Sequence, residues 1–199
     1  RFSDLVKHSE LFDVLVGYFY SSGFHAIYPS LKDTGKIRVL IGISTSKETL
    51  DLINKGNQVI GDEHYNPAEV KEKIGSEVEA EMAGSEDTRQ VEKGVQKFIE
   101  WIKSDKLIIK AYPSQNIHAK LYIMTPKEGS LDEGRVITGS SNFTQSGLSD
   151  NLEFNVELKD NSDYQFAKNQ FDKLWDDSVD VSKDYVDKLR REYIESIKD

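Results

Sequence analysis

The stretch NIHAKLYIM, residues 116–124, decides how this chain folds. Apolar side chains recur at every second position from Ile117 to Ile123, which is the period of a β-strand. His118 and Lys120 occupy the opposite phase, so both side chains point to one face of the predicted strand. An imidazole beside an ammonium group on an interior strand raises the question of a functional site, but this pair alone is more often a chance arrangement or a histidine satisfied within the strand.

Further strands and helices flank this stretch on both sides. Runs rich in β-branched and aromatic residues predict strands over residues 11–20, 36–43, 106–112, 135–139 and 152–158. A short helix is expected to end at Leu31, residues 46–104 have a helical pattern, and two more helices are expected from Asp163 onward. Strands interleaved with helices predict an α/β fold.

One domain with an insertion accounts for this pattern. We expect the domain over residues 1–178, a helical insertion over residues 46–104, and a C-terminal helix over residues 179–199 that leads to a downstream region. The first residue is Arg, so we expect the chain to be a fragment of a longer protein. It has no cysteine and no apolar run as long as a membrane span, which fits a cytoplasmic protein.

The charge is strongly acidic but uneven. A formal net charge of −9 argues against a protein that coats nucleic acid non-specifically. Residues 61–92 hold ten acidic and three basic residues, which we interpret as a solvated helical face, whereas residues 101–147 hold six basic and four acidic residues. A mildly basic segment around the opening stretch is compatible with an anionic substrate.

Polar side chains also follow the next two predicted strands. Ser140 and Asn142 stand two residues apart at the end of one strand, and Glu153 lies near the start of the following one. A neutral imidazole is a good nucleophile toward phosphorus, and a nearby carboxylate stabilises its charged form. Lysine, amide and hydroxyl groups can hold the oxygens of a phosphoryl group in the transition state. No second histidine or carboxylate pair completes a metal site, so we expect metal-free phosphoryl chemistry without a cofactor.

This spacing of residues resembles the phospholipase D superfamily, the HKD phosphodiesterases. The matching pattern is H-x-K, then G-S-x-N, then a downstream Glu, carried by His118, Lys120, Gly139, Ser140, Asn142 and Glu153. The stretches VGYFYSSG and KIRVLIG also resemble the first two strands of that fold, and the likeness covers roughly residues 10–45 and 105–175. More narrowly, the chain resembles the PLD-like domains at the N-terminus of bacterial helicase-type proteins and the nucleases with a single motif.

The resemblance implies both a fold and a reaction. The fold is a mixed central sheet flanked by helices, and the reaction is a two-step phosphodiester hydrolysis through a phosphohistidine. It assigns catalysis to His118, Lys120, Asn142 and Glu153, and phosphate binding to Lys120, Ser140 and Asn142. It implies nucleic acid, with DNA preferred, as the substrate and a helicase or restriction protein as the full-length context. A lipid substrate is disfavoured because no membrane-facing apolar stretch is evident.

Several alternatives stay open beside this interpretation. The family's Asp five residues after the Lys falls on Thr125, and the chain is acidic, so a non-enzymatic module that binds nucleic acid or dimerises is the rival class. Ser140 could equally cap a turn. Trp101 and Trp175 sit in helical stripes and are expected in the core. The remaining histidines lack a motif and are expected at the surface or as satisfied core residues: His8, His25 and His64.

The number of motifs predicts a dimer. The reaction needs one histidine to attack and another to protonate the leaving group, but only His118 is followed by Lys two residues later. A two-fold axis that brings two copies of the motif together would complete one shared site, so we expect a homodimer. The alternative is a second, degenerate half-site elsewhere in the full-length chain.

Overall fold

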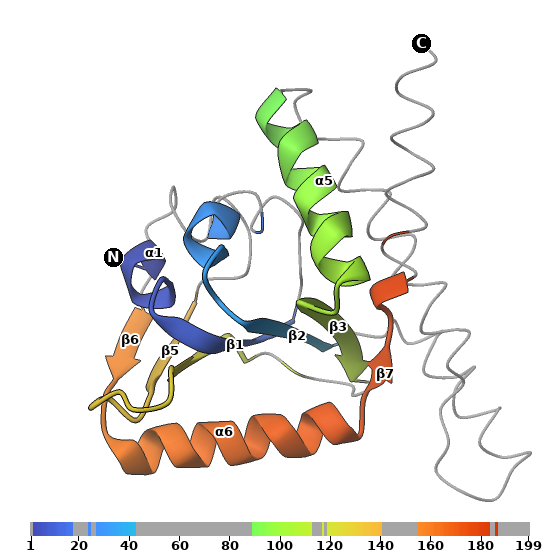
Figure 1. The fold of residues 1–199 in the computed structure, drawn as a ribbon. Helices are drawn as coiled ribbons and strands as arrows, with labels where there is room; N and C mark the ends of the chain where they lie inside the picture. Colours follow the sequence, from blue (N-terminus) through green and yellow to red (C-terminus); the bar gives the residue numbers. More distant parts are fainter. Residues whose placement is uncertain are drawn as a thin grey trace, which may run out of the picture.

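A seven-stranded mixed β-sheet forms the centre of the protein and separates two layers of helices (Figure 1). The computed structural model describes residues 2–17, 24, 27–42, 89–112, 117, 119–140, 155–183 and 186. The described elements follow one another as α1 (Phe2–Val6), β1 (Ser9–Val16), the 3₁₀ helix η1 (Tyr28–Leu31), β2 (Lys36–Gly42), α5 (Arg89–Lys103), β3 (Leu107–Tyr112), β4 (Leu121–Pro126), β5 (Arg135–Gly139), β6 (Asn155–Leu158), α6 (Asn161–Asp176) and β7 (Val179–Asp180).

The strand order places the first strand in the middle of the sheet. The order is β6-β5-β4-β1-β2-β3-β7. Strands β1, β2 and β3 run parallel, while β4, β5 and β6 continue antiparallel from β1 and β7 runs antiparallel to β3. The predicted mixed sheet flanked by helices, and with it the α/β class, is therefore confirmed.

Both faces of the central strands are buried, which explains their nearly continuous apolar sequences. One face packs with α1, η1 and α5 in a core that includes Phe12, Phe24 and Phe98. The other face packs under α6 in a second core that includes Leu40, Ile123 and Phe171. Figure 1 shows α5 and α1 on one side of the sheet and α6 on the other. The two tryptophans predicted for the core are buried, Trp101 in the first cluster and Trp175 in the second.

Most predicted elements occur where the sequence places them. Strands β1, β2, β3 and β5 match their predicted ranges within a few residues, and α5 lies in the segment predicted to be helical. Helix α6 begins at Asn161, two residues before the predicted start, because the carboxylate of Asp160 caps it by accepting from the backbone N–H of Ser162 at 2.8 Å. The two short elements α1 and β7 were not predicted.

The prediction of a strand over residues 116–124 is wrong at its beginning. Strand β4 starts at Leu121, and Ile117, Ala119 and Lys120 precede it without regular secondary structure. The physical reason is the length of the neighbouring strand: Leu121 pairs with Leu15, and β1 ends one residue later at Val16. The other neighbour, β5, also ends one residue past the partner of Leu121, at Gly139, so neither described neighbour offers β4 a longer ladder.

The two outer edges of the sheet differ. At the β3 edge, β7 adds two paired residues, and the hydroxyl of Ser182 then accepts from the backbone N–H of Ile109 at 2.8 Å. The core continues past this point, since Val181 and Val186 are buried in the first cluster. At the other edge stands β6, whose Val156 is 41% exposed. None of the described helices is both long enough and apolar enough to cross a membrane.

Candidate active site

The sheet topology gathers the motif segments at one end of the strands. The parallel strands β1, β2 and β3 all end there, and the antiparallel pairing makes β4 and β6 begin there while β5 ends there. Lys120 directly precedes β4, and Ser140 directly follows β5. We call this end of the strands, marked by Val16, Leu121, Gly139 and Asn155, the motif edge; it runs across the sheet and is not one of the two outer strands.

The described part of the chain contains two of the predicted site residues. Lys120 is half-buried and Ser140 is exposed, and the pairing of Leu121 with Thr138 brings their two strands side by side at the motif edge. The predicted residues His118, Asn142 and Glu153 lie outside the described residues. Among the other histidines, His8 is exposed, in line with the prediction, whereas His25 and His64 also lie outside the described residues.

Two glycines allow the segment before Lys120 to cross the ends of β1 and β2. A Cβ atom at Gly42 would overlap the Cβ of Ile117 and lie 3.0 Å from its Cγ2, while a Cβ at Gly17 would lie 3.1 Å from the carbonyl oxygen of Ile117. Contacts this short force a neighbour to move, and backbone cannot move freely. Gly42 is therefore needed for the close approach that seats Ile117 against the sheet, and Gly17 leaves room for the backbone of Ile117.

Thr138 holds the backbone on the other side of the same segment. Its hydroxyl donates to the carbonyl oxygen of Lys120 at 3.1 Å, so a side chain of β5 fixes the residue that precedes β4. Sequence reasoning missed Thr138, Gly17 and Gly42 as positioning residues. The sequence features that could have indicated them are the glycines at the ends of β1 and β2, and the polar Thr138 within the apolar run of β5.

A buried charge network lies under the same strands. Asp13 on β1 is fully buried and accepts two hydrogen bonds from the guanidinium of Arg38 on β2, at 2.6 and 2.7 Å. Arg38 donates a further bond to Asp172 on α6 at 2.7 Å. Lys168 lies 2.9 Å from Asp172 and 3.4 Å from Asp13. Two cations thus meet two carboxylates, which is a balanced arrangement that fastens α6 to the sheet.

Ion pairing and hydrogen bonding set the direction of the pKa shifts of Arg38 and Asp172. Burial alone would lower the pKa of Arg38, but hydrogen bonds and charge from Asp13 and Asp172 outweigh burial and raise it. Burial likewise favours a higher pKa for Asp172, but Lys168 and Arg38 outweigh it and hold that pKa below its usual range. Arg38 also lies over the Phe171 ring, with its Cζ 4.9 Å from the ring centroid. Arg38 and Asp172 therefore stay charged near neutral pH, each beside an oppositely charged partner, so we assign the network to structure.

Metal ligation has no evident place in the described residues. Within the described ranges, no group of three or more His, Asp or Glu side chains is arranged to hold a metal ion. The groups at the motif edge are instead a lysine, a serine hydroxyl and the backbone of the Ile117–Lys120 segment. Such groups are suited to holding an anion.

Comparisons with known proteins identify a family. The family described as "Cardiolipin synthase, PLD-like domain" matches residues 8–175, which include every strand from β1 to β6. No curated protein matches the chain. Among solved structures, the archaeal chromatin protein TrmBL2, whose structure is described as showing a novel mode of DNA binding, is 12% identical with a TM-score of 0.42. That match covers 89% of this chain but 47% of the archaeal chain, so this chain spans about half of its length.

Proposed function

The chain belongs to the PLD-like family of cardiolipin synthase-type domains, and on this premise we propose that it is a metal-independent phosphodiesterase acting through a phosphohistidine. The family places it among phosphodiesterase-type proteins. The observation that carries the proposal is the motif edge: the half-buried Lys120 and the exposed Ser140 occupy neighbouring strand ends. These are two of the positions that the H-x-K and G-S-x-N pattern assigns to phosphate binding.

The proposed reaction has two steps. An imidazole nitrogen of His118 attacks phosphorus, the bond to the leaving oxygen breaks, and a second histidine protonates that oxygen. Water then attacks the phosphohistidine and releases the phosphoryl group. Lys120, Ser140 and Asn142 hold the non-bridging oxygens, where charge is shared in the transition state. Glu153 is assigned the carboxylate that stabilises the charged imidazole.

The position of Thr125 supports an enzyme over a non-enzymatic module. Five residues of extended chain separate Lys120 from Thr125, a distance of about 17 Å. The hydroxyl of Thr125 lies 2.8 Å from that of Tyr164 on α6, so this position ties β4 to the helix at the far end of the strand. The loss of the family's Asp at this position therefore changes a contact remote from the motif edge.

The finer features of the proposal are the substrate, the assembly and the context. We assign a nucleic acid, with DNA preferred, as the substrate, and a homodimer that shares one site as the active form, because the chain carries a single H-x-K. The full-length context is a cytoplasmic helicase or restriction protein. The dimer accounts for the second histidine by symmetry.

The decisive test is to trap the covalent intermediate. Wild-type protein is incubated with a chromogenic phosphodiester in EDTA, quenched in base, and analysed by mass spectrometry for a phosphorylated peptide that contains His118. We expect an adduct at His118 that is absent from His118→Ala, with turnover that survives EDTA. Turnover that needs magnesium, or an active His118→Ala protein, would refute the mechanism. Nucleic-acid binding with neither turnover nor adduct would support the rival binding module.

A further inference from the structure

A pocket of about 440 Å³ lies at the end of the sheet opposite the motif edge. It is formed by α1 and the start of β1 on one side, and by the end of β4 and the following hairpin on the other. Strand β4 connects the two regions, since it begins beside Lys120 and ends at Pro126, which lines the pocket. Six residues of strand separate them by about 20 Å. The pocket is therefore distinct from the candidate active site.

The inner wall of this pocket is apolar. Leu5, Met124 and Pro126 line it, and Met124 is almost completely buried. The volume lies in the range of about 300–1,000 Å³ that is typical of sites for small organic ligands. A compact ring or similar apolar body could pack there, whereas a nucleic-acid duplex could not enter.

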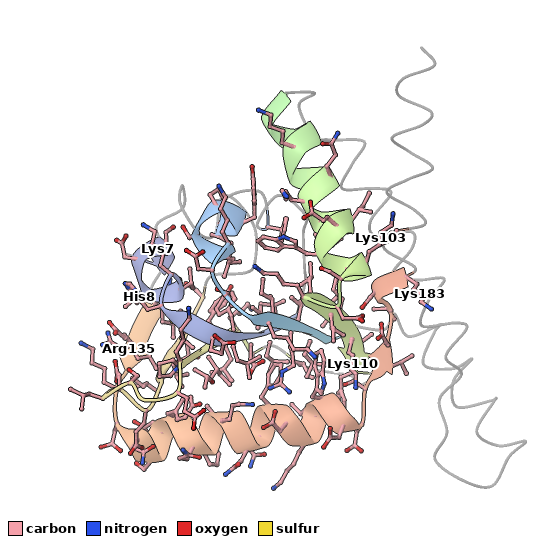
Figure 2. The ribbon with its side chains drawn as sticks, in the orientation of Figure 1. Lys7, His8, Lys103, Lys110, Arg135 and Lys183 are labelled. Atoms are coloured by element: carbon pink, nitrogen blue, oxygen red, sulfur yellow. The ribbon has the colours of Figure 1, made fainter. Side chains whose placement is uncertain are left out.

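The rim of the pocket carries more positive than negative charge. Three cationic side chains line it, Lys7, Lys127 and Arg135, against two carboxylates, Asp4 and Asp132. Figure 2 shows Lys7, His8 and Arg135 on one side of the molecule, where α1, β1 and β5 meet. This local excess stands out on a chain whose formal net charge is −9.

The carboxylates are already committed to partners within the rim. Asp4 accepts from Lys7 at 3.2 Å, and Asp132 accepts from Arg135 at 2.7 Å. The side chains of Lys127 and His8 are exposed, and neither side chain makes a hydrogen bond or ion pair within the described part of the chain. Ser130 also lines the pocket; its hydroxyl accepts from the backbone N–H of Asp132 at 3.2 Å and keeps its own O–H to donate. An ammonium, an imidazole and a hydroxyl from two segments of the chain are thus available to one ligand, and together they suit an oxyanion.

From this combination we propose that the pocket binds a small organic phosphate, with a phosphate group at Lys127 and His8 and an apolar body against Leu5 and Met124. The size limits the ligand to about that of a mononucleotide. The proposal does not depend on the proposed phosphodiesterase activity, because it concerns other residues and binding alone.

The test is binding of adenosine monophosphate, followed by amide chemical shifts in NMR and by calorimetry. We expect shifts at residues 5–9 and 126–134, and clearly weaker binding of adenosine or inorganic phosphate alone. Lys127→Glu should weaken binding of adenosine monophosphate by about tenfold or more, since it replaces attraction by repulsion. The matched control is Lys183→Glu, the same charge reversal at an exposed lysine on the far side of the molecule (Figure 2).

A second control separates this pocket from the candidate active site, which is also expected to bind phosphates. Lys120→Ala should leave the affinity of the pocket unchanged. The proposal is overturned if Lys120→Ala abolishes binding, if Lys127→Glu and Lys183→Glu weaken it equally, or if no shift occurs around the pocket at millimolar ligand. Failure here with a trapped phosphohistidine would refute only the pocket, and the reverse result would refute only the phosphodiesterase.

Discussion

Replacement of Gly42 by alanine should impair the motif edge far more than its one added methyl group suggests. The new Cβ would overlap the Cβ of Ile117 and lie 3.0 Å from Cγ2, whereas carbon atoms in favourable contact lie about 3.5–4.0 Å apart. Ile117 must therefore move by roughly 1 Å, and it carries the segment that ends in Lys120 with it. We expect turnover to fall about 100-fold, the effect of a 1 Å misplacement of reacting groups. The overpacking should also lower the free energy of unfolding by about 1–3 kcal/mol.

The matched control uses the other end of the same strand. Gly35 precedes β2, and a Cβ there would meet the carboxylate of Glu10, the flexible end of a side chain that can turn away, and would lie 3.1 Å from the backbone oxygen of Glu10. Gly35→Ala should therefore keep turnover close to wild type and lose clearly less stability than Gly42→Ala. The assays are hydrolysis of a chromogenic phosphodiester and denaturant unfolding. Equal stabilities for the Gly42→Ala and Gly35→Ala proteins would refute the packing argument, and a destabilised but fully active Gly42→Ala protein would refute the link to catalysis.

A double variant tests the contact between residues 42 and 117 directly. Combining Gly42→Ala with Ile117→Gly adds a Cβ on one side of the contact and removes it from the other. If the overlap is the cause, the double variant should be more stable than the sum of the two single effects allows, and a double-mutant cycle measures that excess. Additive effects would mean that the two residues do not constrain each other.

The remaining predictions concern the charge network, acid stability, β4 and assembly. Arg38→Met should lower the free energy of unfolding by about 3–5 kcal/mol, because it leaves the buried carboxylate of Asp13 without its main partner; a denaturant-measured loss below about 1 kcal/mol would contradict this. The lowered pKa of Asp172 contributes stability that is present above its ordinary value of 3.8 and lost as the pH falls through the lowered value, so Asp172→Asn should flatten the acid limb of a stability profile. Thr125→Val should cost about 1 kcal/mol of stability and leave turnover unchanged, whereas a large loss of turnover would place this residue in the chemistry. Heterodimers of wild type with His118→Ala should be nearly inactive, and half-maximal activity per heterodimer in a mixing experiment would show independent sites.

The sequence predicts the sheet well because its strands are buried on both faces. Alternating and continuous apolar runs specify β1, β2, β3 and β5 without reference to the rest of the chain. The same rule fails at residues 116–120, where Ile117 and Ala119 also alternate. What ends β4 at Leu121 is the length of its partner β1, and no local pattern encodes that length.

The candidate site could be predicted only in part from the sequence. The resemblance of H-x-K and G-S-x-N to a family places Lys120 and Ser140 at one edge, and the topology brings their strands together there. The supporting contacts of Gly42, Thr138 and Arg38 were not predicted, because each depends on a partner far away in sequence. Strand β7 was not predicted, because a strand of two residues is too short to show an alternating pattern.

The central position of β1 has a consequence for how the protein is made. The strand leaves the ribosome long before its neighbour β4, which is more than 100 residues downstream, and α6, which covers the Asp13 side of β1, follows later still. Until α6 emerges from the exit tunnel, the apolar surface of Leu15, Leu40 and Ile123 lacks the helix that covers it in the structure. Nascent chains stalled before residue 161 should therefore depend on chaperones, whereas chains extended past the core residue Val186 should fold and release them.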